Sequence, residues 1–268
     1  MLGTRVKSAL VFVPLLLLIS WLGGIVYFLA ILVILGIGTW EYWRLLKTLG
    51  YDVSFPLMLI GVEMLLILRQ VSGFTAADWS LLVILLGSAI FSLVRYSKIE
   101  AQAVLTFGLH VSSILYLGWL GGYFLSLATL PKGNWWVMVT FVLVWMADLG
   151  GYIFGTKWGK HKMSLRLSPR KTWEGYLGGV IFGVGSGLLL SWLLRPVLPE
   201  FALLEGAVMG LVLALVTPFG DLFISMIKRA AGVKDSGTLI PGHGGILDRA
   251  DTWLWAMMLG YYLMLAFA

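Results

Sequence analysis

The sequence predicts an all-α protein that crosses a membrane several times. Of its 268 residues, 60% are hydrophobic and only 12% are charged, whereas an ordinary soluble domain carries about 25% charged residues. Apolar runs long enough for a membrane-spanning helix, which needs about 20 residues, recur along the whole chain. This composition excludes a disordered chain and a free cytosolic enzyme, and the absence of cysteine excludes a disulfide-bonded scaffold.

The apolar runs give the number and order of the predicted helices. They cover 9–40, 54–70, 77–94, 102–130, 134–156, 174–194, 202–227 and 252–268. The first run is too long for one helix and is interrupted by Gly23 and Gly24, so we expect a hairpin of two helices there. The result is about nine transmembrane helices in a single integral membrane domain over 1–268, the first helix being retained rather than cleaved.

The distribution of basic residues predicts the orientation in the membrane. Lys and Arg accumulate in cytoplasmic loops. With nine helices and a cytoplasmic N-terminus, every basic residue except Arg69, Lys132 and Arg195 faces the cytoplasm. The alternative of eight helices, with 9–40 as one helix, leaves Arg5 and Lys7 outside as well. Topology thus accounts for the net charge of +6, and we expect no nucleic-acid partner.

Two predicted cytoplasmic loops, 157–173 and 228–251, hold much of the charge. Both fall in the second half of the chain, so we expect 1–133 to be mainly scaffold helices and 134–268 to be the catalytic half. Between the two loops, Gly175, Gly179, Gly183 and Gly187 recur every four residues. This spacing predicts close packing of a helix against its neighbours, and a dinucleotide-binding loop is excluded because no strand precedes it.

Four carboxylates are candidates for a functional role. Asp148 and Asp221 fall inside predicted spans, where a charged side chain is costly and marks a functional site by default. Asp248 and Asp251 are three residues apart, on one face of a helix, and Asp251 could equally be the N-cap of the last span. Carboxylates without cysteine favour a hard cation such as Mg²⁺, which also binds phosphate oxygens.

Basic residues beside these carboxylates predict an anionic substrate. Arg170 and Lys171 follow Pro169 and precede a helix that Thr172 could cap, and such a helix N-terminus suits a phosphate group. The loop 241–245 is rich in glycine, which lets backbone N–H groups approach a phosphate, although a plain turn would have the same composition.

The segment 225–251 carries a resemblance to a known family. It follows the pattern S-x-x-K-R-x4-K-D-x5-P-G-H-G-G-x2-D-R-x-D at every fixed position, and this pattern resembles the signature of phosphatidate cytidylyltransferases, or CDP-diacylglycerol synthases. The block 160–175, with Ser168-Pro-Arg-Lys-Thr-Trp-Glu-Gly175, is also similar to the family. The resemblance covers roughly 140–268. One position departs from it, because Leu149 stands where the family usually has a small hydroxyl residue.

The resemblance implies a reaction and a set of roles. CTP and phosphatidate would give CDP-diacylglycerol and pyrophosphate with one or two Mg²⁺ ions, an additional monovalent ion being left open. The protein would be a homodimer in the bilayer of the inner membrane, with its active site facing the cytoplasm.

The resemblance also implies roles for individual residues. The metal ligands would be Asp221 and Asp248 first, then Asp148 and Asp251. The catalytic residues would be Lys171, Lys228, Asp248, His243 and Arg249. The substrate-binding residues would be Ser168, Arg170, Lys171, Thr172, Ser225, Arg229, Lys234, Asp235, Gly242, Gly244 and Gly245.

Phosphate chemistry limits what the catalytic residues have to do. The lipid phosphate would attack the α-phosphorus of CTP, and because its second pKa is near 6 it already lacks the proton. We therefore expect His243 to contact phosphate or orient its loop rather than act as a base. The main alternative function is an ion- or proton-coupled transporter. A CDP-alcohol phosphotransferase is disfavoured because its aspartate-rich motif is missing.

Overall fold

The computed structural model describes residues 2–240, 242 and 244–267, and side chains from residue 10 onward except at 77 and 78. The chain forms two compact units, which are treated separately below. The first unit combines Met1–Leu130 with Ile227–Ala250, and the second combines Pro131–Met226 with Asp251–Ala268. The segment that carries most of the signature thus groups with the N-terminal helices rather than with its neighbours in the sequence.

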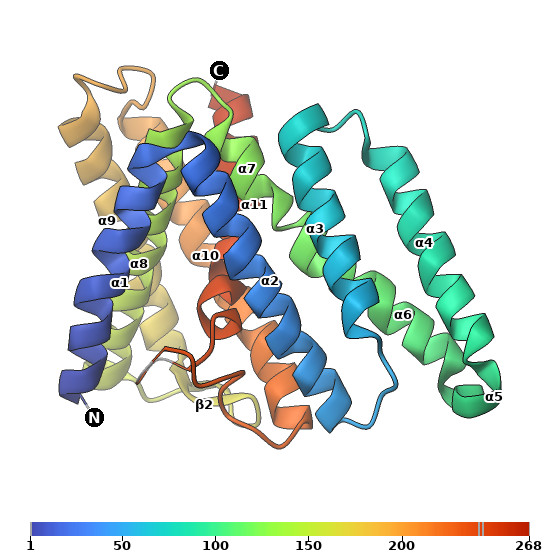
Figure 1. Ribbon diagram of the computed structural model, residues 1–268. Helices are drawn as coiled ribbons and strands as arrows, with labels where there is room; N and C mark the ends of the chain where they lie inside the picture. The colour runs from blue at the N-terminus through green and yellow to red at the C-terminus, as the bar shows by residue number, and fades with distance from the viewer. Residues whose placement is uncertain (1, 241, 243, 268) are drawn as a thin grey trace. The chain divides into compact units, whose positions relative to one another are not determined.

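The first unit is built from consecutive helices joined by short turns. They are α1 (Leu2–Leu22), α2 (Gly24–Thr48), α3 (Phe55–Ser72), α4 (Ala77–Val94), α5 (Tyr96–Ile99), η1 (Glu100–Gln102), α6 (Ala103–Ile114), η2 (Leu115–Trp119) and α7 (Gly122–Ala128). Helices α1 and α2 form an antiparallel pair (Figure 1). The chain reverses at Gly23 and Gly24, whose φ angles of 60° and 51° favour glycine. The predicted hairpin over 9–40 is therefore confirmed.

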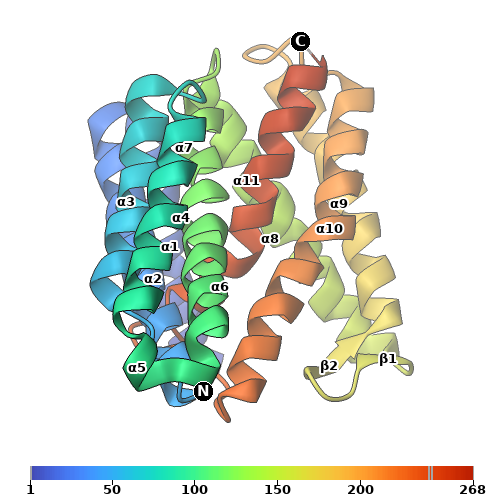
Figure 2. The ribbon, with the colours of Figure 1, turned by 90° about the vertical axis from the view of Figure 1, so that its right-hand side faces the viewer.

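The second unit combines four long helices with a small hairpin at one end. It contains α8 (Gly133–Trp158), β1 (Lys162–Ser164), β2 (Ser168–Thr172) and α9 (Trp173–Leu194), with most of α10 (Leu203–Ala230) and α11 (Leu247–Phe267). The strands pair antiparallel and join α8 to α9 at one end of both helices (Figure 2). The predicted all-α architecture is therefore incomplete, because it did not include this β-hairpin. Its backbone is extended before Pro169 because the proline ring disfavours the helical conformation in the preceding residue.

The predicted glycine stripe of α9 makes two close helix contacts. A side chain at Gly175 or Gly179 would press on backbone carbonyls of α8, and one at Gly183 or Gly187 would press on those of α10. Small residues allow helix backbones to approach in this way, which replaces the hydrophobic driving force that is absent between helices in lipid. The stripe therefore packs the first part of α9 against α8 and the following part against α10, and the close packing that the four-residue spacing predicts is confirmed.

Six helices in the described part of the chain are long and apolar enough to cross a membrane. They are Gly24–Thr48, Phe55–Ser72, Tyr96–Ala128, Gly133–Trp158, Trp173–Leu194 and Leu203–Ala230. Leu10–Leu22 and Trp79–Val94 are shorter apolar helices. Each predicted span falls on a helix, and the protein is an integral membrane protein. The number of nine spans and the cytoplasmic N-terminus stay predictions.

The last predicted loop is shorter than 228–251. Helix α10 continues to Ala230 and α11 begins at Leu247, so Lys228, Arg229, Asp248 and Asp251 all lie on helices. Asp251 is therefore not an N-cap. Helix α10 ends in a Schellman motif, in which Val233 N donates to Lys228 O and Gly232 N donates to Arg229 O. The motif depends on a left-handed residue, and Gly232 has φ 71°.

This end of α10 gives a first test of the fold. Gly232→Ala should lower the free energy of unfolding by about 1 kcal/mol, because alanine is strained at positive φ. A side chain would meet no atom there, so the loss isolates the backbone effect. Gly185→Ala is the matched control, since Gly185 is helical and equally open. Chemical unfolding in detergent should show no loss for the control, and equal stability of the two variants would contradict the motif.

Asp52 forms an ion-pair group that gives a second test. Arg95 Nη2 lies 2.5 Å from one carboxylate oxygen and Lys47 Nζ lies 3.3 Å from the other. The Arg95 guanidinium, ahead of Lys47, holds the pKa of the Asp52 carboxyl below its usual range. The stability from this group is therefore present above the unfolded-state pKa of about 3.9 and is lost as pH falls through the lower folded-state value. Compared by chemical unfolding between pH 7 and pH 3, the wild type and Asp52→Asn should converge in stability at the acid end. A stability difference between the wild type and Asp52→Asn that grows toward low pH would contradict this role of the ion pairs.

Candidate functional site

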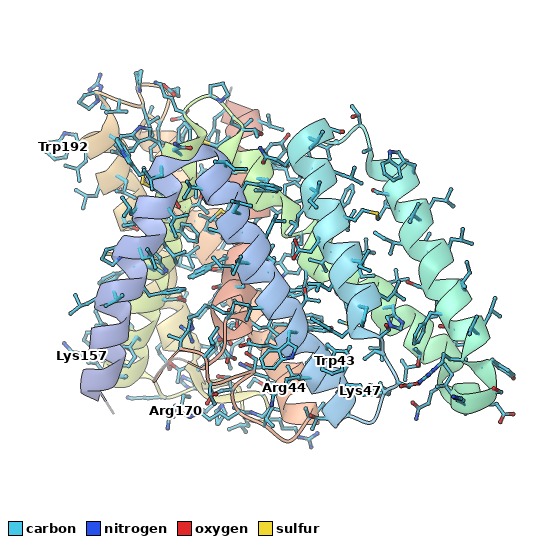
Figure 3. The ribbon with its side chains drawn as sticks, in the orientation of Figure 1. Trp43, Arg44, Lys47, Lys157, Arg170 and Trp192 are labelled. Carbon is cyan, nitrogen blue, oxygen red and sulfur yellow. The ribbon has the colours of Figure 1, made fainter. Side chains whose placement is uncertain are left out.

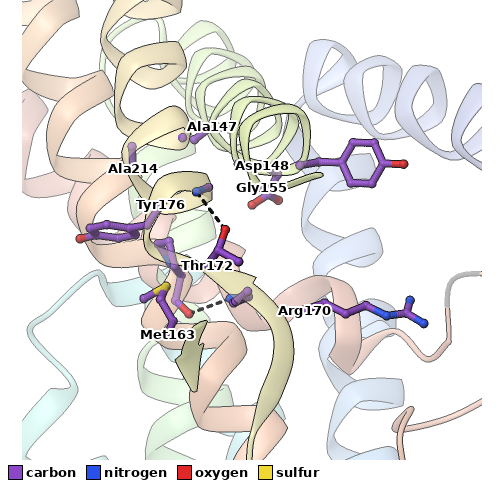
Figure 4. Close-up of a pocket in the computed structure, with 14 residues that line it drawn as sticks. Ala147, Asp148, Gly155, Met163, Arg170, Thr172, Tyr176 and Ala214 are labelled. Atoms are coloured by element: carbon purple, nitrogen blue, oxygen red, sulfur yellow. Dashed lines mark hydrogen bonds between the residues drawn. The ribbon is translucent and has the colours of Figure 1, made fainter. Parts of the chain in front are cut away.

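The second unit contains a pocket at the end of α9 that carries the hairpin. Its volume is about 240 Å³, and it is lined by α8, both strands of the hairpin, α9 and α10. Charged residues Asp148, Arg170 and Lys171 line it together with Tyr152 and Tyr176 (Figure 4). Figure 3 shows Arg170 and Lys157 at one end of this unit and Trp192 at the other. The pocket thus joins charged and apolar groups at one end of helices that cross the membrane.

Small residues create this space. Gly151, Gly155, Gly175 and Gly179 all line the pocket. Thr172 closes its edge as the N-cap of α9, since its hydroxyl accepts a hydrogen bond from Gly175 N at 3.1 Å. The predicted cap is therefore confirmed. The residues directly before it, Arg170 and Lys171, are thus fixed beside the positive N-terminal end of α9, where a phosphate group is favoured.

Lys171 links β2 to the kinked part of α10. Its ammonium group lies 2.7 Å from Asp221 Oδ2 and donates to Pro218 O at 3.2 Å. Tyr176 makes a similar bond from α9, because its hydroxyl donates to Leu215 O at 2.9 Å. Both acceptor carbonyls belong to α10, one at Pro218 itself and the other three residues before it. The Asp221 partner was missed because residues 171 and 221 are far apart in the sequence.

Asp221 is held but remains accessible. Its side chain is 32% exposed, and Ser225, one helical turn further along α10, donates from its hydroxyl to Asp221 Oδ1 at 3.2 Å. Asp148 is exposed and lines the pocket, and the neighbouring Leu149 is exposed as well. Asp251 is buried, and its Oδ1 accepts a hydrogen bond from Thr252 N at 2.7 Å. Of these three carboxylates, Asp148 and Asp221 are the accessible ones.

The first unit holds a second, buried cluster around Asp248. Lys228 Nζ lies 2.5 Å from Asp248 Oδ1, and the two side chains are only 8% and 4% exposed. Asp248 Oδ2 accepts from the backbone N–H groups of Ser236 at 2.8 Å and Gly245 at 2.9 Å. The Ser236 hydroxyl lies 3.0 Å from the same oxygen. Removal of one partner would leave a buried charge uncompensated, so this ion pair is sensitive to substitution.

The loop 231–246, which joins α10 to α11 and is called the signature loop below, contains glycines that make room for carboxylates. A Cβ atom at Gly244 would lie 2.5 Å from Asp248 Oδ2, and Gly244 also has φ 83°. A Cβ atom at Gly245 would meet the Glu41 carboxylate and Ser236 Oγ. Glycine is thus favoured at Gly244 by its positive φ angle, and at both positions by the lack of space beside the buried carboxylates of Asp248 and Glu41. Gly242 is exposed, whereas His243, which was expected to contact phosphate or orient its loop, lies outside the described residues, as does Pro241.

The remaining predicted residues lie on α10, on α11, in the loop between these helices and in the hairpin. Arg229 is exposed and donates to Val233 O at 3.0 Å, and Lys234 and Asp235 are exposed. Arg249 lies on α11, half-buried, with its Nε atom buried and without a hydrogen-bond partner. Ser168 lies at the pairing position opposite Ser164 in the hairpin. Among the residues that the structure describes, no three His, Cys, Asp or Glu side chains converge as a metal site.

Glu41 is the functional candidate that the sequence analysis missed. It is fully buried on α2 and accepts hydrogen bonds from Ser236, Ile246 and Leu247. The signal was weak, because Glu41 directly follows the apolar run 9–40, and only the continuation of α2 to Thr48 places it inside a span, where a carboxylate is a functional candidate. It went unread because 1–133 was expected to be mainly scaffold.

The long apolar helices and these two clusters define a class, a polytopic membrane protein with acidic and basic groups at helix ends. Comparison with known proteins gives the family. The sequence model of the cytidylyltransferase family matches residues 3–267, and the chain belongs to this family. It is 32% identical to a phosphatidate cytidylyltransferase of Synechocystis sp., over 97% of this chain and 95% of that protein. It is 31% identical to one of Staphylococcus haemolyticus, over 96% and 95%.

Proposed function

We propose that the protein transfers the cytidylyl group of CTP to phosphatidate, giving CDP-diacylglycerol and pyrophosphate. The observation that carries the proposal is the complete signature 225–251 in a chain that aligns almost end to end with phosphatidate cytidylyltransferases. The arrangement of the signature supports it, because Lys228 and Asp248 are both fixed in one buried hydrogen-bonded cluster. The pocket of the second unit adds cations beside a helix N-terminus, as a phosphate substrate requires.

The reaction needs alignment and charge neutralisation more than acid–base chemistry. A phosphate oxygen of phosphatidate forms a bond to the α-phosphorus of CTP while the bond to the α–β bridging oxygen breaks, and its electrons leave with pyrophosphate. The lipid phosphate is already largely dianionic at neutral pH, so no side chain has to remove a proton. Two highly charged groups must nevertheless meet in line, which calls for fixed positive charge around the phosphates.

Arg170 and Lys171 are our first candidates for holding phosphate in the second unit. Both precede the N-terminus of α9, and the Thr172 cap fixes the backbone that carries them. Lys171 is 26% exposed and paired with the accessible Asp221, so its ammonium group can reach a phosphate without leaving a buried anion behind. Lys228 and Arg249 are the corresponding candidates in the first unit, with Arg229 and Lys234 at the exposed end of α10.

The donor set fits Mg²⁺. All the candidate ligands are carboxylates, and Mg²⁺ usually takes one or two of them and completes its shell with water and substrate phosphates, so three converging side chains are not required. We propose Asp221 and Asp248 as the first choices, then Asp148 and Asp251. When bound, the ion would neutralise phosphate charge and polarise the α-phosphate. The role of Lys171 would then include holding Asp221 in place before substrate arrives.

The proposal includes the membrane topology, location and assembly of the enzyme. We propose nine spans with a cytoplasmic N-terminus, location in the inner membrane, a site facing the cytoplasm and assembly as a homodimer. The charge distribution along the sequence supports the orientation.

A pyrophosphate assay tests the activity. Purified protein in mixed micelles with phosphatidate, CTP and Mg²⁺ should release pyrophosphate, and chelation of the metal should abolish release. Replacing phosphatidate with a neutral diacylglycerol is the control, because it lacks the attacking phosphate. No release from any substrate, together with metal-independent uptake of a solute into vesicles, would instead support a transporter.

A further inference from the structure

Glu41 lies far from the signature in sequence and touches it in space. It is on α2, in a helix apolar enough to span the membrane, and its side chain is 0% exposed. Figure 3 shows Trp43, Arg44 and Lys47, which come after it on the same helix, near the C-terminal end of α2. A fully buried carboxylate needs hydrogen-bond donors around it, and the identity of those donors indicates its role.

Among the residues that the structure describes, three donate to Glu41, and they lie on either side of the glycine-rich segment 241–245. Leu247 N donates to Oε2 at 2.8 Å and Ile246 N donates to Oε1 at 3.1 Å. These are N–H groups at the start of α11, which have no partner within the helix and carry its positive dipole end. The Ser236 hydroxyl lies 2.8 Å from Oε2. Glu41 thus caps α11 across 206 residues of sequence.

The loop is shaped around this carboxylate. A Cβ atom at Gly237 or Gly245 would collide with the oxygens of Glu41, so a side chain at either position would displace the carboxylate from its hydrogen bonds. Ser236 connects the carboxylate to the proposed active site. Its hydroxyl contacts Glu41 Oε2 and Asp248 Oδ2, while its backbone N–H donates to Asp248. The segments that hold Asp248, around Ser236 and Gly245, are therefore the ones that Glu41 fixes.

We propose that Glu41 is a positioning residue for cytidylyl transfer: it holds 236–237 and 245–247 so that Asp248 keeps one orientation. This inference rests on the proposed function. Glu41 itself touches no substrate, and its effect passes through the loop backbone and Ser236. A displacement of about 1 Å in such a site can lower turnover by about 100-fold.

Glu41→Gln is the test variant, because it keeps the shape but turns an amide N–H₂ toward backbone N–H donors. We expect kcat to fall at least about 10-fold while KM for CTP and for phosphatidate stays within about threefold. Hydrogen exchange should accelerate at the amides of 236–247 and stay unchanged in α8 and α9. Glu63→Gln is the matched control, since Glu63 is a half-buried glutamate on the neighbouring α3 that lines a separate apolar groove.

The outcomes separate the possible roles. Wild-type kcat and loop exchange in Glu41→Gln would overturn the proposal, and so would faster exchange throughout the protein, which would mark Glu41 as a general folding residue. Glu41→Asp, which keeps the charge, should recover part of the lost turnover, and no recovery in a folded protein would also count against it. If the wild type releases no pyrophosphate, the proposed function fails, and hydrogen exchange alone decides whether Glu41 fixes the loop.

Discussion

Asp221→Asn should lower the rate of cytidylyl transfer by about 100-fold or more while the protein stays folded. The substitution removes a proposed metal ligand and the anion that holds Lys171 beside the pocket. The stability should change little, because both side chains are partly exposed and such ion pairs contribute about 0–1 kcal/mol. Initial rates of pyrophosphate release and thermal unfolding in detergent measure the two effects.

Asp52→Asn is the control for this substitution. Asp52 has almost the same exposure, at 30%, and is likewise held by basic side chains, Lys47 and Arg95, but it lies outside both clusters. Its loss should leave turnover unchanged at neutral pH. If Asp221→Asn retains more than about a tenth of wild-type turnover, Asp221 is neither a metal ligand nor the residue that positions Lys171.

Lys228→Met should destabilise the protein by about 3 kcal/mol and abolish its activity. The substitution leaves Asp248 in a buried site without its cation, which is strongly unfavourable. The two backbone donors to Asp248, Ser236 N and Gly245 N, remain, so we expect the lower end of the usual range for a broken buried pair. Methionine keeps the length of the lysine side chain, so packing changes little.

Lys47→Met tests whether burial is the cause. Lys47 pairs with Asp52 at 3.3 Å, but its side chain is 42% exposed, so its loss should change stability by less than about 1 kcal/mol. Chemical unfolding of both variants in the same detergent gives the comparison. Similar small losses in the two variants would mean that the Lys228–Asp248 pair is solvated and does not organise the signature loop.

Features encoded locally were predicted correctly. The helical hairpin follows from two adjacent glycines, the start of α9 from Pro169 and Thr172, and the packing of α9 from glycines at four-residue spacing. Each depends on residues within a few positions of one another. The end of α10 had a local signal too, because Gly232 follows two alanines, but the composition of the loop was given more weight.

Contacts between distant parts of the chain were not predictable. Asp251 was a reasonable local N-cap, yet α11 begins four residues earlier, because Glu41 accepts its first N–H groups. Similarly, Lys171 and Asp221 were each selected as site residues, but nothing local indicated that they pair. One sequence identifies the residues able to do chemistry, whereas their partners depend on tertiary packing.

Transfer of a label from the α-phosphate of CTP tests the central claim most directly. Purified protein with phosphatidate, Mg²⁺ and CTP labelled at the α-phosphorus should move the label into a lipid product, with one unlabelled pyrophosphate released for each lipid formed. Label that stays in a soluble nucleotide while pyrophosphate appears would contradict the account, because CTP would then be hydrolysed rather than attacked by the lipid phosphate.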